Sequence, residues 1–221
     1  MNVPLCFNLD AGRTGRLLAS VMLVLLAAHV LVMQANFNDG LGLKQALDFE
    51  YWQVAIFDLD EEESFGTWFS AAILFLASLL FFNQASLRRE QFDRLHYWWF
   101  ALGLGFCLMS VDEVVGMHEL INTIFDESLW AGLSLGLVAV AFVGFMPFLW
   151  CYRWQTSGLF VVAGILFAGG AVGVEQYSGT DINSLRYNML TALEEGMEMS
   201  GVILAIYTVL KLTAAEQLAP D

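Results

Sequence analysis

The sequence predicts an all-α fold: a polytopic integral membrane helix bundle with six transmembrane helices and both termini on the cytoplasmic side. Its 221 residues are 58% hydrophobic and only 14% charged, with a mean hydropathy of +0.62. A soluble domain has roughly 25% charged residues, so this composition indicates a membrane protein. The apolar residues also gather in runs of about 20, the length with which a helix crosses the hydrocarbon core.

The apolar runs leave no soluble domain, so we expect one transmembrane domain over the whole chain. The expected spans are 15–34, 64–83, 96–118, 129–151, 157–176 and 188–211. The first follows Arg13 and Arg16 as a signal peptide would, but no small-residue cleavage site comes after it, so we expect it to be retained. The connection 35–63 is expected to be an acidic extracytoplasmic loop, and the tail 213–221 to be disordered.

Basic residues set the expected orientation of these spans. The predicted cytoplasmic side holds Arg13, Arg16, Arg88, Arg89, Arg94, Arg153 and Lys211, and the outer side holds only Lys44 and Arg186. Because Lys and Arg are enriched in cytoplasmic loops, both termini are expected in the cytoplasm. Most acidic residues then lie in the outer loops or the outer halves of spans, so the net charge of −14 belongs mainly to one face.

The basic, cysteine and glycine residues of the sequence limit the kinds of partner that we expect. The chain has no basic patch, so nucleic acid is not expected as a partner, whereas membrane lipids are. Its three cysteines are widely spaced and predict no disulfide framework. Gly169 and Gly173 have the spacing that lets helices approach closely. They predict either packing within the bundle or contact with a second copy or a partner membrane subunit.

The third expected span ends in a group of ionisable residues that is costly at membrane depth. Each ionisable side chain at the centre of a span costs roughly 2.5–3.5 kcal/mol on insertion scales, so such a group needs a partner. In a continuous helix Asp112 and Glu119 share one face, with Gly116 between them. Glu113 and His118 point to either side of that face.

The last expected span carries a second acidic group, at the same depth. Glu194 and Glu198 are four residues apart and Glu195 and Glu198 three apart, so all three lie on one side of the helix. The second span opens with an acidic run that ends at Glu63, on the same predicted side of the membrane. We therefore expect these residues to meet in the outer half of the bundle, where their like charges need protons or a bound cation.

Oxygen ligands with one imidazole predict a divalent metal ion, with zinc, iron, manganese and calcium all left open. The expected metal ligands are Glu63, Asp112, His118, Glu119, Glu194 and Glu198. Glu113 or Glu195 is the expected general base, or orients the water that attacks a substrate. A di-iron carboxylate site usually includes Glu-x-x-His on two helices, and this chain contains no such motif.

The run from Ser110 to Glu119 and the run from Glu194 to Gly201 resemble those of uncharacterised bacterial multi-pass membrane proteins. Those proteins have a similar acidic motif with histidine in a middle span and a Glu-Glu-Gly-x-Glu motif in the last one. The resemblance implies the bacterial cytoplasmic membrane and implies no activity. A looser likeness, of architecture only, is to the membrane hydrolases that include alkaline ceramidases and adiponectin-type receptors. Those use a histidine trio on zinc, which this chain lacks.

Three functions remain open at this point. The favoured one is a metal-dependent membrane enzyme that acts on a lipid or lipid-linked substrate entering from the bilayer. The second is a pathway for cations or protons, which needs polar groups in the inner half as well. There the sequence offers only Ser78, Ser110 and Thr208. The third is an accessory or assembly subunit whose acidic residues bind a partner.

Overall fold

A computed structural model describes residues 9–38, 42, 55–117, 127–174, 177 and 184–217. The regular structure within these residues is helical throughout, as expected. In chain order its elements are α1 (Ala11–Phe37), the 3-10 turn η1 (Ala55–Phe57), α4 (Phe65–Glu90), α5 (His96–Val115), α7 (Glu127–Trp150), α8 (Trp154–Ala168), the π-helix η2 (Gly169–Val174) and α10 (Leu185–Gln217).

Five helical stretches in the described part of the chain are long and apolar enough to cross a membrane. They are α1, α4, α5, the continuous helix formed by α8 and η2, and α10. The expected span 129–151 corresponds to α7, in which Val138–Trp150 forms a shorter apolar stretch. The helical fold is therefore confirmed and the five apolar helices are consistent with a multi-pass membrane protein, while the six crossings and the cytoplasmic termini stay predictions.

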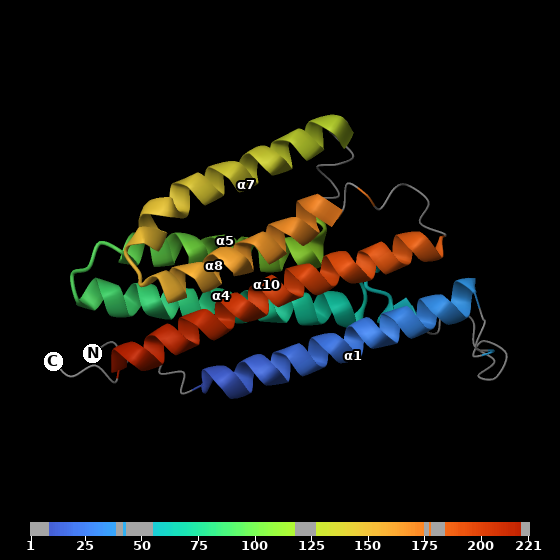
Figure 1. The fold of residues 1–221 in the computed structure, drawn as a ribbon, viewed down its shortest axis with the longest axis horizontal. Helices are drawn as coiled ribbons and strands as arrows, with labels where there is room; N and C mark the ends of the chain where they lie inside the picture. Colours follow the sequence, from blue (N-terminus) through green and yellow to red (C-terminus); the bar gives the residue numbers. More distant parts are fainter. Residues whose placement is uncertain are drawn as a thin grey trace.

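The bundle is built around α4 and α10 (Figure 1). α5 packs along α4, while α8 and α1 both pack along α10. α7 lies at the edge of the bundle (Figure 1) and contacts mainly α8 and η2. The two central helices are half buried within the protein, whereas α1, α5 and α8 leave most of their surface exposed.

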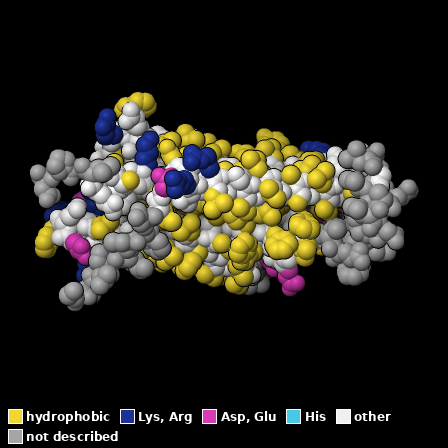
Figure 2. Space-filling model, turned by 90° about the horizontal axis from the view of Figure 1, so that it is seen from below, with side chains coloured by type: hydrophobic (Ala, Val, Ile, Leu, Met, Phe, Trp, Pro, Cys, Tyr) yellow, Lys and Arg dark blue, Asp and Glu magenta, His cyan; other side chains and the backbone are white. Residues whose placement is uncertain are grey.

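Aromatic rings hold α4, α5 and α7 together near one end of the bundle. Trp99 of α5 is fully buried, with its ring centroid 5.7 Å from that of Phe81 and 5.0 Å from that of Phe148. The Trp99–Phe148 pair is edge-to-face, and packing of this kind adds roughly 0.5–1.5 kcal/mol beyond the burial of apolar area. Hydrophobic side chains also cover the middle of the outer surface (Figure 2), as insertion into a bilayer requires.

Local sequence explains where several helices begin and end. Asp10 caps α1 by accepting a hydrogen bond from the backbone N–H of Arg13 at 2.7 Å. Ser64 caps α4 in the same way for Thr67, at 3.2 Å. α5 ends at Val115 because Gly116 adopts a left-handed conformation, with φ at 61°. The expected span 96–118 was therefore too long at this end.

The expected disordered tail 213–221 is wrong for residues 213–217, which continue α10. Polar contacts with α4 explain the longer helix. Thr213 accepts a hydrogen bond from the Gln84 amide at 3.2 Å, and Glu216 forms an ion pair with Arg88. These partners lie about 130 residues away in the chain, beyond the reach of a local sequence pattern.

The two ends of the bundle differ in charge. α1 begins, α4 ends and α10 ends at the same end of the molecule (Figure 1). Lys and Arg side chains gather toward that end on the face seen in Figure 2. The opposite end, called here the acidic end, holds the end of α5, the start of α10 and the segment 58–63. The predicted orientation puts the acidic end outside the cytoplasm.

Candidate functional site

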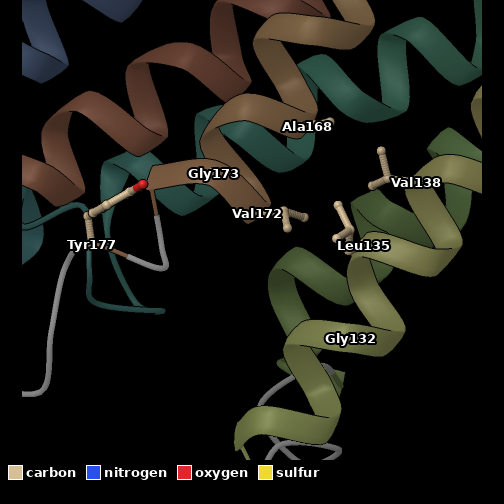
Figure 3. A pocket seen from close by; sticks show the side chains of 7 residues that line it. All are labelled: Gly132, Leu135, Val138, Ala168, Val172, Gly173 and Tyr177. Carbon is tan, nitrogen blue, oxygen red and sulfur yellow. The ribbon is translucent and has the colours of Figure 1, made fainter.

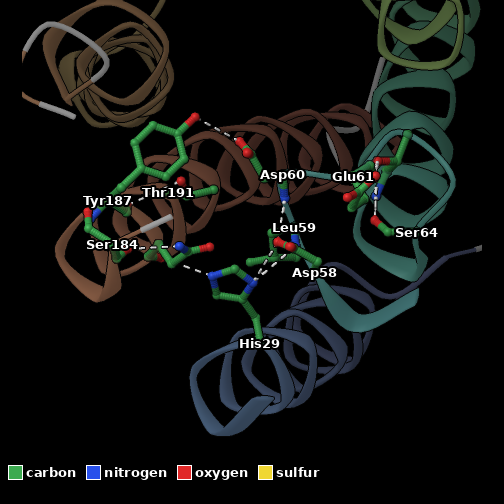
Figure 4. A network of polar contacts seen from close by, with 11 residues as sticks. His29, Asp58, Leu59, Asp60, Glu61, Ser64, Ser184, Tyr187 and Thr191 are labelled. Atoms are coloured by element: carbon green, nitrogen blue, oxygen red, sulfur yellow. Dashed lines mark hydrogen bonds and ion pairs between the residues drawn. The ribbon is translucent and has the colours of Figure 1, made fainter. Parts of the chain in front are cut away.

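A buried histidine joins three parts of the chain at the acidic end. The His29 side chain is fully buried in α1. Its Nδ1 accepts a hydrogen bond from the backbone N–H of Leu59 at 3.0 Å, and its Nε2 lies 2.9 Å from the backbone carbonyl of Asn188. The imidazole therefore ties α1 both to the segment before α4 and to the first turn of α10 (Figure 4).

Two aspartates extend this network toward α10. Asp58 is 4% exposed, and its Oδ1 lies 3.3 Å from His29 Nδ1 and accepts the backbone N–H of Asp60 at 3.0 Å. The Tyr187 hydroxyl donates to Asp60 Oδ1 at 3.2 Å (Figure 4). Burial raises the pKa of Asp60 above its ordinary value of 3.8, although the Tyr187 hydrogen bond acts in the opposite direction. The 58–60 segment is thus held between α1 and α10.

The acidic residues of α10 form the second part of the site. Glu194, Glu195 and Glu198 are each partly buried. The carboxylates that act on Glu195 electrostatically include those of Glu198, Glu113, Glu194 and Asp60. Carboxylates from α5, α10 and the 58–60 segment are therefore within electrostatic range of Glu195, and a single site formed by Glu113, Glu194, Glu195 and Glu198 stays a prediction.

A close helix contact fixes the position of Glu194 and Glu198. A Cβ atom added to Gly170, in the π-helix η2, would lie 2.7 Å from the Glu194 carbonyl oxygen and 2.9 Å from Glu198 Cγ. Only glycine allows the two helices to come this close. Single π-helical turns inside α-helices occur frequently at functional sites. The wide turn places the backbone of η2 directly against the acidic stretch of α10.

Among the described residues, the structure does not bring the other expected metal ligands together in the same way. Glu63 is exposed, just before the cap of α4. Asp112 is partly buried in the last turn of α5, where its carbonyl accepts the Gly116 N–H at 2.7 Å. His118 and Glu119 lie outside the described residues. Within the described part of the chain, no three His, Cys, Asp or Glu side chains are close enough together to hold a metal ion.

An apolar groove opens between α7 and the opposite face of η2. Its volume is about 500 Å³ (Figure 3). It is lined by Gly132, Leu135, Val138, Ala168, Val172, Gly173 and Tyr177. A Cβ at Gly173 would meet nothing within 4 Å, so this side of η2 is open. The π-helix therefore separates an apolar groove from the acidic stretch of α10.

Gly169 and Gly173, which the sequence predicts to form one face for close helix contact, have different neighbours in the structure. A Cβ at Gly169 would lie 2.9 Å from the terminal methyl group of Met197, within the same chain. Gly169 thus serves packing inside the bundle, while Gly173 faces the groove. Contact with a second copy or another membrane subunit through this face stays a prediction.

Sequence reasoning did not select the His29, Asp58, Asp60 and Tyr187 network. His29 is one polar residue in an apolar run, which is more often a packing residue than part of a site. Its partners are 30 and 159 positions away along the chain. The available signal was the pair of aspartates directly before the Glu61–Glu63 run, at the same predicted depth as His29.

The chain matches the family described as Domain of unknown function (DUF8692) over residues 18–212, and it belongs to that family. The match includes both parts of the site, from His29 to Glu198. Comparison with curated proteins finds no match, and comparison with solved structures finds none either.

Proposed function

We propose that this member of the DUF8692 family is a metal-dependent membrane enzyme whose divalent cation is held among the carboxylates at the acidic end of the bundle. The observation that carries the proposal is the acidic stretch of α10, which packs against Gly170 at Glu194 and Glu198 and whose Glu195 is acted on by carboxylates of α5 and the 58–60 segment. Carboxylates within electrostatic range of one another repel unless protons or a cation neutralise them.

The composition of the chain supports a cation from outside it. The sequence has 23 acidic and nine basic residues, and only Lys44 and Arg186 fall on the predicted outer side. Arg186 donates to the Tyr177 carbonyl at 3.2 Å, and Arg88 pairs with Asp93 and Glu216 at the opposite end. Carboxylate oxygens are the ligands that calcium, magnesium and manganese prefer, and an imidazole extends the range to zinc and iron.

The ligand set that we propose is the one that the sequence predicts. Glu194 and Glu198 come from one face of α10, and Asp112 comes from the last turn of α5. Zinc and iron sites commonly include an imidazole, and His118 follows the end of α5 by three residues in the sequence. Glu119 is next to it. In this arrangement Glu113 or Glu195 accepts the proton of the attacking water.

The substrate class follows from the membrane setting. The groove between α7 and η2 is open, apolar and adjacent to the helix that packs on Glu194 and Glu198. A lipid or lipid-linked substrate can place a hydrocarbon chain there and its polar part at the acidic end. Binding sites of this kind are mostly apolar, with a few converging polar groups that provide orientation.

Metal analysis of the purified full-length protein tests the proposal. We expect wild-type protein dialysed against Mn²⁺ or Zn²⁺ to retain about one ion per chain, and Glu198→Gln and Asp112→Asn to weaken binding at least about tenfold. Glu62→Gln, an exposed change at the same end, is the matched control and should leave binding unchanged. Wild-type protein without a bound divalent ion in any preparation contradicts the proposal.

The polar groups in the inner half of the bundle do not support a cation or proton pathway. Ser78 and Thr208 donate their hydroxyl hydrogens to backbone carbonyls, both at 2.7 Å. Ser110, which we expected in the inner half, lies five residues before the end of α5 and so toward the acidic end, where it donates to the Ala71 carbonyl at 2.8 Å. Hydroxyls used in this way stabilise helices and do not form a chain of exchangeable protons. Flux into liposomes that contain the protein, above the leak of empty vesicles, would instead support transport. An accessory role predicts neither flux nor metal.

A further inference from the structure

The hydrogen bonds around His29 define its proton positions. A backbone carbonyl can only accept, so Nε2 carries a proton and donates it to the Asn188 oxygen. A backbone N–H can only donate, so Nδ1 has no proton when it accepts from Leu59. The described geometry is therefore that of a neutral imidazole with its proton on Nε2.

This assignment puts two acceptors side by side. The Nδ1 lone pair lies 3.3 Å from Asp58 Oδ1, and both side chains are almost completely buried, at 0% and 5% exposure. An ionised carboxylate beside that lone pair is repelled, and the low dielectric of the interior strengthens the repulsion. One added proton, on Nδ1 or on Oδ1, converts the repulsion into a hydrogen bond.

We infer that His29 and Asp58 form a proton-binding site that controls the position of the 58–60 segment. Proton uptake at Nδ1 creates an imidazolium that donates to Asp58, and it deprives the Leu59 N–H of its acceptor. Proton loss restores the bond from Leu59. The two protonation states therefore hold the same segment by different hydrogen bonds.

The groups around the imidazole come from two parts of the chain. The segment before α4 presents Asp58 and Asp60 to the imidazole. α10 presents the Asn188 carbonyl and Tyr187, which is itself acted on by Glu194. The two aspartates are acidic, the Asn188 carbonyl accepts and the Tyr187 hydroxyl donates to Asp60, and in the described residues Lys or Arg forms ion pairs only at Arg88, at the opposite end.

Proton uptake by the His29–Asp58 pair also affects the acidic stretch of α10. The 58–60 segment carries Asp60, which bonds to Tyr187 and acts electrostatically on Glu195. A change in the bonds of Leu59 alters how firmly Asp60 is held against α10. The inference goes beyond the proposed function, because it requires no metal ion and holds for metal-free protein.

Amide hydrogen exchange at Leu59 provides the direct test, made on metal-free full-length protein in lipid nanodiscs at about pH 5 and about pH 8. After correction for the intrinsic pH dependence of exchange, we expect protection of Leu59 to be about fivefold lower at the acidic pH. That ratio corresponds to a net hydrogen bond of about 1 kcal/mol. The ¹⁵N imidazole signal that His29→Gln removes should show protonation of Nδ1 over the same range.

Two variants make the outcome decisive. His29→Gln can accept from Leu59 and donate to Asn188 but cannot take up a proton, so protection should be high and equal at both pH values. Asp58→Asn keeps His29 but removes the carboxylate, and it should also abolish the difference. Equal protection of Leu59 at both pH values in the wild type overturns the inference, and so does an undiminished pH effect in His29→Gln.

Discussion

Asp60 shows how burial turns an ordinary carboxyl into a pH-sensitive one. Because burial raises its pKa, the folded protein binds this proton more tightly than the unfolded chain does. Asp60 therefore contributes stability that is fully present below its ordinary value of 3.8. That contribution is lost as the pH rises through the raised value.

The prediction for Asp60 is a change in the pH dependence of stability. Asp60→Asn cannot ionise, yet its carbonyl can still accept the Tyr187 hydrogen bond. We expect its melting temperature to fall less than that of the wild type between about pH 4 and about pH 7. Thermal unfolding of both proteins in the same detergent, followed by circular dichroism, measures the difference. Parallel curves would show that the raised pKa of Asp60 does not influence folding.

Tyr152 supports a second prediction at the scale of single residues. Its hydroxyl accepts the indole N–H of the fully buried Trp99 at 2.9 Å, and burial raises the pKa of Tyr152 to about 12. Tyr152→Phe leaves that N–H without its acceptor, which we expect to cost about 1–3 kcal/mol of stability. Tyr97→Phe is the control, since Tyr97 is 68% exposed. Equal unfolding of the two variants in an SDS titration would refute the assigned role.

Residue spacing predicted one part of the candidate site and could not predict the other. Glu194, Glu195 and Glu198 share a helix face because of their separation, and Glu113 follows from depth in a neighbouring span. His29 and Asp58 meet only because two chain segments fold together. Nothing local to either residue distinguishes a hydrogen-bonded histidine from a packed one.

The sequence indicates a helix boundary where a local capping residue determines it. Ser64 and Gly116 have the chemistry of a helix start and a helix end, so the end of α5 at Val115 could have been read from Gly116. The extension of α10 to Gln217 could not, because Thr213 and Glu216 depend on contacts with α4. Tertiary contacts of this kind override a polar tail pattern.

Close contact of α8 and α10 leads to a prediction at the scale of elements. A Cβ at Gly201 would lie 2.6 Å from the Ala163 carbonyl oxygen and 2.8 Å from the Phe167 nitrogen, both backbone atoms. Gly201→Ala therefore forces the helices apart, and we expect a loss of about 1–3 kcal/mol in stability. Steric-trap or SDS unfolding of the purified protein measures it.

Gly164→Ala is the matched control for this contact. It lies in the same pair of packed helices, but its Cβ would meet nothing within 4 Å. We expect no loss of stability and up to about 1 kcal/mol of gain from helix propensity. If Gly201→Ala and Gly164→Ala unfold alike, close approach at Gly201 is not what holds α8 to α10.

At the scale of the whole molecule, composition and charge bias were enough to predict a multi-pass helical membrane protein. Hydropathy predicts the crossing of α7 over residues 129–151, and that crossing stays a prediction. Orientation follows from the separation of Lys and Arg from the acidic end. That separation predicts that Arg89 faces the cytoplasm and Glu62 the outside.

Thiol labelling in intact cells tests this orientation. In a variant with Cys6, Cys107 and Cys151 replaced by Ser, we expect Glu62→Cys to react with a membrane-impermeant maleimide. Arg89→Cys should react only after the cells are opened. The reverse pattern would place the acidic end in the cytoplasm and would move the proposed site to the other side of the membrane.

The most direct measurement of the central claim is an anomalous difference map from crystals of the protein grown with Mn²⁺. The account predicts a peak within about 2.0–2.6 Å of carboxylate oxygens of Glu198 and of at least one further residue among Asp112, Glu119 and Glu194. The same crystals of Glu198→Gln should lack it. A wild-type map with no peak beside Glu198 would contradict a metal site at the acidic end.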